Sequence, residues 1–97
     1  MKFRKKPVVI EAVPIGMLMD SASGAWRELP SFVSDAYDRG DLLFVYDGID
    51  IKTLEGWMHG GPADMLIRGV QGELYPCKPE IFYATYEQVE EPRGIER

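Results

Sequence analysis

The stretch LLFVYDGIDIKTL, residues 42–54, decides the fold, because it predicts a β-hairpin. Two runs of β-forming residues flank the pair Asp47-Gly48, and an Asp-Gly pair in that setting is a strong signal for a tight turn. The second run, IDIKTL, alternates apolar and polar residues. One of its faces should therefore point toward a core and the other toward water. We expect an antiparallel sheet to be built around this hairpin.

The residues just before the hairpin predict a helix over about 30–39. Apolar residues recur there at helical spacing, at Leu29, Phe32, Val33, Ala36 and Tyr37. Pro30 suits the first helical position, and Gly40 suits the C′ position that follows the last turn.

Further short strands are predicted on both sides. The strand candidates are PVVIEAVPI (7–15), buried on much of both faces, MLIR (65–68), a strand that begins at ELY (73–75) after a turn at VQG (70–72), and YATYEQV (83–89). PCKPEIF (76–82) predicts an extended corner and one helical turn, while GMLMDSASG (16–24) and EGWMHGGPAD (55–64) predict loops. Five or six short strands and one helix give an α+β domain, whose small antiparallel sheet stays open or closes partly into a barrel.

Length and composition favour one small domain. The chain has 97 residues, of which 45% are hydrophobic. We expect a single globular unit over residues 1–90 and a disordered polar tail at 91–97. A chain of this size has a thin core, so association with further copies would add burial, and we expect a homo-oligomer.

Charge and cysteine content narrow the setting of the protein. The single cysteine, the lack of a long apolar run and the lack of a signal-peptide pattern predict an intracellular protein with no membrane span. A net charge of −5 argues against a generic nucleic-acid binder. Four of the eleven basic residues nevertheless lie in the first six positions, at Lys2, Arg4, Lys5 and Lys6. That basic start either attracts the acidic far end of the chain or is simply solvated.

Three segments carry a resemblance to a known family. They read KFRKKPVVIEAV (2–13), IKTLEG (51–56) and IRGVQGELYPCKPEIFYATYE (67–87). In these the chain resembles a family of small proteins of tailed phages and prophages, which begin MKFRKKPVVIEA and carry a PGDW or PGDY loop before IRGV. Here that loop reads Gly61-Pro62-Ala63-Asp64-Met65. The resemblance implies a phage origin, the cytoplasm of the host cell and a small β-rich fold, and it assigns no catalytic residue.

The residues themselves offer little for catalysis. Cys77 has a neighbouring cation in Lys78, which could lower the thiol pKa, but a single cysteine is usually a small buried hydrophobe. The only histidine, His59, lies eighteen positions earlier, and one His with one Cys is too few for a zinc site within one chain. The GWMHGG segment has no phosphate-loop ending. We therefore expect neither an enzyme nor a bound cofactor or metal.

Binding of a small anion is better supported. Arg68, at the end of a predicted strand, could present a rigid guanidinium to phosphate or carboxylate, and Lys78 and Arg4 could add positive charge. Aromatic faces on which a base could stack are offered by Trp57, Tyr75 and Tyr83. Each also has a structural alternative: a salt bridge from Arg68 to Glu73, packing for the tyrosines, and a cap on a barrel end for Trp57.

Three hypotheses for function follow. The leading one is a phage accessory protein that sequesters a small anionic ligand, such as a nucleotide immune signal, and so acts against host defence. The second is a protein-interaction module that uses Trp57 and an exposed sheet edge to inhibit a host protein or to serve phage assembly. The third and weakest is a small hydrolase that uses Cys77 or an acid.

Overall fold

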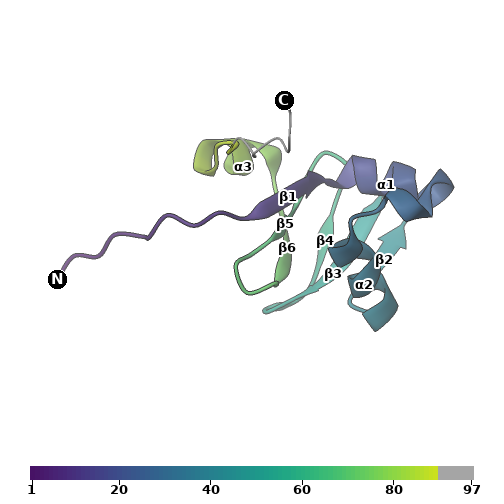
Figure 1. The fold of residues 1–97 in the computed structure, drawn as a ribbon, viewed down its shortest axis with the longest axis horizontal. Helices are drawn as coiled ribbons and strands as arrows, with labels where there is room; N and C mark the ends of the chain where they lie inside the picture. Colours follow the sequence, from purple (N-terminus) through teal and green to yellow (C-terminus); the bar gives the residue numbers. More distant parts are fainter. Residues whose placement is uncertain (90–97) are drawn as a thin grey trace, which may run out of the picture.

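The computed structural model describes residues 1–89, and Figure 1 shows their arrangement. In chain order the elements are β1 (Glu11–Pro14), α1 (Ile15–Gly24), the 3-10 turn η1 (Trp26–Glu28), α2 (Ser31–Arg39), β2 (Leu42–Val45), β3 (Gly48–Thr53), β4 (Gly56–Gly60), β5 (Met65–Arg68), β6 (Leu74–Cys77) and α3 (Pro79–Thr85). The tail predicted at 91–97 lies outside the described residues.

Six strands form two antiparallel sheets of three strands each, in the orders β1-β5-β6 and β2-β3-β4. Together with the helices they make a mixed α+β fold, which confirms the predicted class and strand number. The sheets stay separate, so the described residues form no closed barrel.

The core lies where both sheets and two helices meet. Its buried members are Ile15 and Leu18 of α1, Leu29, Val33 and Ala36 around α2, Leu42, Ile49 and Ile51 of the β2-β3-β4 sheet, and Leu66 and Leu74 of the β1-β5-β6 sheet. The helices α1 and α2 cover the inner face of the β2-β3-β4 sheet (Figure 1). They pack there because the apolar residues of β3 and of α2 recur at the strand and helix periods.

The central hairpin and the α2 helix confirm the two clearest predictions. β2 pairs with β3 in the register Leu42↔Ile51, and the two-residue turn is Tyr46-Asp47, one position earlier than predicted. The helix α2 follows Pro30, which precedes the first helical residue, and it ends at Gly40, whose φ of 82° is left-handed. Glycine reaches that conformation without the penalty that a Cβ imposes.

The prediction of a surface loop over 16–24 is wrong, because these residues form α1. Its glycines and serines have weak helix propensity, but tertiary contacts override them. Leu18 is fully packed into the core, and the first backbone amides of the helix donate to the loop before β5: Ile15 N to Asp64 O at 2.9 Å and Gly16 N to Pro62 O at 2.9 Å. A contact 46 or more residues away carries no local sequence signal.

The predicted strand 7–15 is also wrong over most of its length. Only Glu11–Pro14 pair, and residues 1–9 are exposed in an extended segment that leaves the body (Figure 1). The cause is the short partner strand. Glu11 lies opposite Arg68, the last residue of β5, and the chain then turns back, with Gly69 N donating to Glu73 O. Residues before Glu11 therefore have no strand beside them.

Two further predictions fail near the other turns. Gly56–Gly60, predicted as part of a loop, is the strand β4, and the strand predicted at 83–89 does not form. Instead Pro79–Thr85 are the helix α3, with Pro79 in its first turn. The rings of Phe82 and Tyr86, four positions apart, lie with their centroids 5.2 Å from each other. A contact between residues four apart is typical of a helix, whereas the alternation of residues 83–89 predicted a strand.

Candidate functional site

Arg68 is engaged by a carboxylate other than the predicted one. Its Nη1 lies 2.7 Å from Oε1 of Glu11 on β1, and its guanidinium sits 5.6 Å from the ring centroid of Phe32. The predicted bridge to Glu73 is wrong, because Glu73 instead accepts a hydrogen bond from the Gln71 backbone at 2.9 Å. Glu11 and Arg68 are directly opposite in the register and so share a face.

Lys78 and Cys77 do not form a nucleophilic pair. The Nζ of Lys78 lies 3.2 Å from Oδ2 of Asp64, and that buried oxygen also accepts from Gly61 N at 2.9 Å. Partial burial, aided by the nearby charges of Asp64 and Glu80, raises the pKa of the Cys77 thiol. The lowering that Lys78 could have caused does not occur, and the thiolate is scarcer at neutral pH than for a free cysteine.

The Gly61–Asp64 loop has a structural task. Its carbonyls cap the first turn of α1, and the carboxylate of Asp64 closes the loop on Gly61 N. Ala63 replaces the glycine of the resembled family here, and no residue other than glycine has a positive φ among residues 1–89. The loop thus needs no left-handed residue after Pro62.

The predicted stacking residues are spread over different elements. Trp57 lies on β4, not in a loop, and points from the outer face of the sheet opposite Lys52. Tyr75 is on β6, where partial burial and the neighbouring Tyr86 hydroxyl raise its pKa to about 12. Tyr83 is exposed on α3, with its ring edge-on to Phe82 at 5.1 Å. The tyrosines thus follow the packing alternative at least in part.

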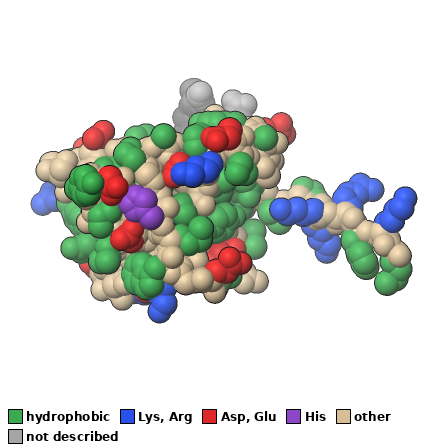
Figure 2. Space-filling view, turned by 180° about the vertical axis from the view of Figure 1, so that it is seen from behind, with side chains coloured by type: hydrophobic (Ala, Val, Ile, Leu, Met, Phe, Trp, Pro, Cys, Tyr) green, Lys and Arg blue, Asp and Glu red, His purple; other side chains and the backbone are tan. Residues whose placement is uncertain are grey.

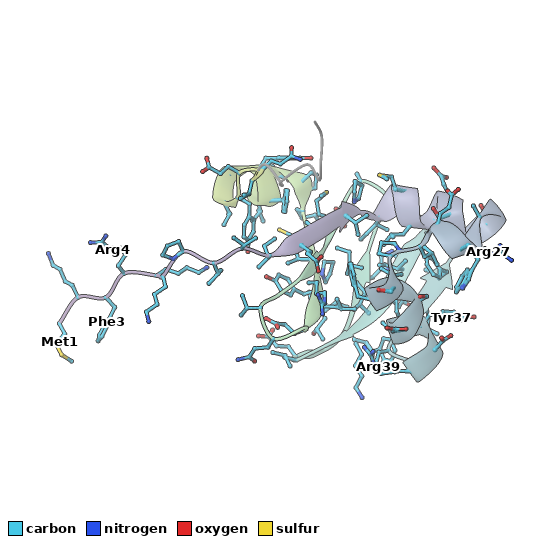
Figure 3. All side chains as sticks on the ribbon, in the orientation of Figure 1. Met1, Phe3, Arg4, Arg27, Tyr37 and Arg39 are labelled. Carbon is cyan, nitrogen blue, oxygen red and sulfur yellow. The ribbon has the colours of Figure 1, made fainter. Side chains whose placement is uncertain are left out.

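Arg4 belongs to the extended segment before β1 and is fully exposed, as Figure 3 shows together with Met1 and Phe3. The described residues of one subunit therefore do not bring the six predicted site residues together. Two hollows, of about 240 and 320 Å³, are lined instead by residues around the β3-β4 and β5-β6 turns. Glu55 and Glu73 line the second hollow and disfavour an anion there, whereas the two acids of the first hollow are balanced by Arg39 and Lys52.

What the fold does assemble is the outer face of the β2-β3-β4 sheet. One row across the three strands is Leu43, Asp50 and His59, and the next pairs Lys52 with Trp57. These side chains are exposed or half-buried, and Leu43 and Trp57 keep 45% and 52% of their surface in water. Figure 2 shows this side of the molecule, with the single histidine in purple among acidic and apolar groups.

A charged cluster marks the same face. His59 Nδ1 lies 2.8 Å from Oδ1 of Asp50, and its Nε2 lies 3.6 Å from Oδ1 of Asp47. The hydrogen bond to Asp50 and the charges of both aspartates raise the pKa of His59. The alternation of IDIKTL predicts that Asp50 and Lys52 face outward. The third strand of this face, β4, has no such signal, because the glycines around Trp57 indicate a loop.

Comparison with known proteins adds no relative: no family model, no curated protein and no solved structure matches this chain. Among residues 1–89, no group of three or more His, Cys, Asp or Glu is arranged to hold a metal ion. Within the same range, no helix has the length and apolarity needed to cross a bilayer.

Proposed function

We propose that the protein is a phage-encoded accessory protein that acts by binding another protein, of the host or of the phage, and not by catalysis. One observation carries the proposal: the outer face of the β2-β3-β4 sheet is open and bears two exposed apolar side chains, Trp57 on β4, 52% of whose surface is in water, and Leu43 on β2. The phage origin is supported by the resemblance of residues 2–13, 51–56 and 67–87.

The chemistry of that face suits protein recognition. Tryptophan is among the residues that contribute most to binding energy at the centres of interfaces, since its large ring buries much apolar area at small entropic cost. The carboxylates of Asp47 and Asp50 lie against His59, and Asp50 stands on the central strand between Leu43 and β4. A fitting partner therefore presents apolar pockets for Trp57 and Leu43 and basic residues between them.

The position of β4 adds a second mode of attachment. β4 is the last strand of its sheet, so one of its edges is not paired within the sheet. An unpaired edge offers backbone donors and acceptors to an extended segment of a partner. This joins Trp57 and the sheet edge, the two features of the interaction hypothesis, in one strand.

Affinity capture from host lysate tests the proposal. The tagged wild-type chain should retain a stoichiometric partner, and Trp57→Ala and Leu43→Ala should each weaken that complex, by about thirtyfold in Kd for the tryptophan. Ile81→Ala is the matched control, because Ile81 is 57% exposed on α3, outside this sheet. Retention that is equal in all four proteins would refute the proposal.

Sequestration of a small anionic ligand is the second candidate, and one observation favours it. Glu11, the first residue after the N-terminal segment, lies opposite Arg68 in the strand register. The guanidinium of Arg68 and the four basic residues at positions 2–6 therefore belong to one end of the molecule. Phosphate groups would be bound there by cations from one or more subunits.

Thermal shift against cyclic and linear nucleotides separates the two candidates. A ligand that binds only the folded state raises the melting temperature by mass action. If ligand binding is the function, Arg68→Ala and Arg4→Ala should abolish the shift, while Arg39→Ala, which removes a pair with Asp41 elsewhere, should retain it. A panel that leaves the wild-type curve unmoved would rule out nucleotides as the ligand.

A further inference from the structure

The N-terminal arm, residues 1–10, is exposed out of proportion to its composition. Phe3, Val8 and Val9 are 87%, 50% and 72% exposed, although the last four residues of the arm, PVVI (7–10), are rich in strand-forming residues. Figure 3 shows the side chains of Met1, Phe3 and Arg4 standing clear of the body. Apolar β-branched residues held in water are a surface that gains free energy when covered.

The arm continues an open sheet edge. β1 is the first strand in the order β1-β5-β6, so one side of it has no neighbour within its sheet. Residues 7–14, PVVIEAVP, thus form one extended stretch whose second half is already held as a strand by β5. The first half cannot fold back on β1 within the same chain, because PVVI contains no turn-forming pair.

We propose that this edge pairs, antiparallel, with the same edge of a second copy, so that two three-stranded sheets become one sheet of six strands. The inference goes beyond the proposed function. It concerns the other sheet and would stand even if the outer face of the β2-β3-β4 sheet bound nothing.

Charge favours a second copy as the occupant. The arm carries four basic residues and no acid, so the rest of a chain of net charge −5 carries −9. Each arm would therefore lie against an acidic body, and the two contacts of a twofold dimer would be identical. The edge formed by the arm and β1 is self-complementary, because its basic residues precede Val8 and Val9 and its acid, Glu11, follows them.

Geometry then selects a register. Two identical antiparallel edge strands are related by a twofold axis perpendicular to the sheet, so directly opposed residues must share a face and their numbers must add to an even sum. With Val8 on the axis, Lys5 lies opposite Glu11 of the second copy. Shifting the axis to Val9 sets Glu11 opposite Pro7, and that charge pair is lost.

Cysteine cross-linking tests the register in the full chain. In a Cys77→Ser background, Val8→Cys places two cysteines across the axis, with Cα atoms about 4.5–5.5 Å apart, which a disulfide can bridge. Mild oxidation should give a covalent dimer far faster than for Ser23→Cys, an exposed control position on α1. Equal rates for the two variants would overturn the proposal.

Sedimentation of full-length variants tests the charge pair. Lys5→Glu places like charges opposite Glu11 twice per dimer and should raise the dimer Kd by about tenfold, an effect that added salt reduces. Lys2→Glu makes the same charge change opposite Pro14 and should weaken the dimer less. A wild-type chain that stays monomeric at every concentration, or equal effects of the two substitutions, would contradict the proposed pairing.

Discussion

The two sheets of this protein have the same number of strands but differ in how their faces are used. In the β1-β5-β6 sheet, the consecutive residues Leu66 and Ile67 point to opposite faces and both are fully buried. In the β2-β3-β4 sheet, Leu42 is fully buried, while the next residue, Leu43, is 45% exposed. The central strand β5 of one sheet is covered on both faces, whereas the other sheet is covered on one.

That difference separates scaffold from available surface. A strand buried on both faces contributes to stability through each residue, whereas a one-sided sheet has an outer face that can change without unfolding the domain. The outer face of the β2-β3-β4 sheet also carries an exposed tryptophan and the His59 cluster. The proposed partner binding uses the open face of this sheet, and the proposed self-association uses the edge of the other.

The largest expected effect is on the free energy of unfolding, when two consecutive apolar residues are truncated one at a time in each sheet. Leu66→Ala and Ile67→Ala should each lower the free energy of unfolding by about 2–5 kcal/mol, because each leaves a cavity. Leu42→Ala should cost a similar amount, while Leu43→Ala should cost about 0.5 kcal/mol or less. Urea denaturation of the four variants measures this. A large loss for Leu43→Ala would mean that the outer face is not open.

The two tryptophans sharpen the comparison at intermediate magnitude. Trp26 and Trp57 are 40% and 52% exposed, but the Trp26 ring contacts Tyr37 at 5.0 Å and Phe44 at 5.7 Å between centroids. Trp26→Ala should therefore cost about 1–3 kcal/mol, since it removes two aromatic contacts and buried area, and Trp57→Ala should cost less than about 1 kcal/mol. Thermal melts in parallel measure the difference. Equal losses would assign Trp57 to packing.

The smallest effect is a pH dependence of stability from His59. The folded-state pKa is raised above the ordinary value of 6.5, chiefly by the hydrogen bond to Asp50. Its contribution to stability is thus fully present below pH 6.5 and is lost as pH rises through the folded-state pKa. Denaturation midpoints from mildly acidic to mildly alkaline pH should show this fall for the wild type. His59→Gln should lack it, and a fall of the same size in that variant would contradict the assignment.

Local patterns in the sequence were sufficient for some elements and not for others. The Asp47-Gly48 pair and the positions of Pro30 and Gly40 identify the hairpin and α2, because their signals lie within a few residues. α1 was missed because its stability comes from Leu18 in the core and from loop carbonyls near residue 64. The residues of the arm favour a strand, but the length of the partner strand β5, which limits how much of that segment can pair, is not visible in them.

The candidate site shows the same division. Arg68 pairs with a carboxylate, but that of Glu11, which lies 57 positions away and is set opposite Arg68 by strand register. The outward direction of Asp50 and Lys52 can be predicted from the alternation of polar and apolar residues. The strand β4 cannot be predicted in this way, because the glycines on both sides of Trp57-Met58-His59 indicate a turn.

Amide hydrogen exchange of the wild-type chain over a range of protein concentrations tests the contrast between the sheets most directly. We expect that exchange of the backbone amides between Pro7 and Pro14 slows as concentration rises, because the edge of β1 becomes paired, while exchange in Gly56–Gly60 does not change. If Gly56–Gly60 slow and residues 7–14 do not, the copies meet through the β2-β3-β4 sheet. Its outer face would then be a contact between copies and not a free surface for a partner.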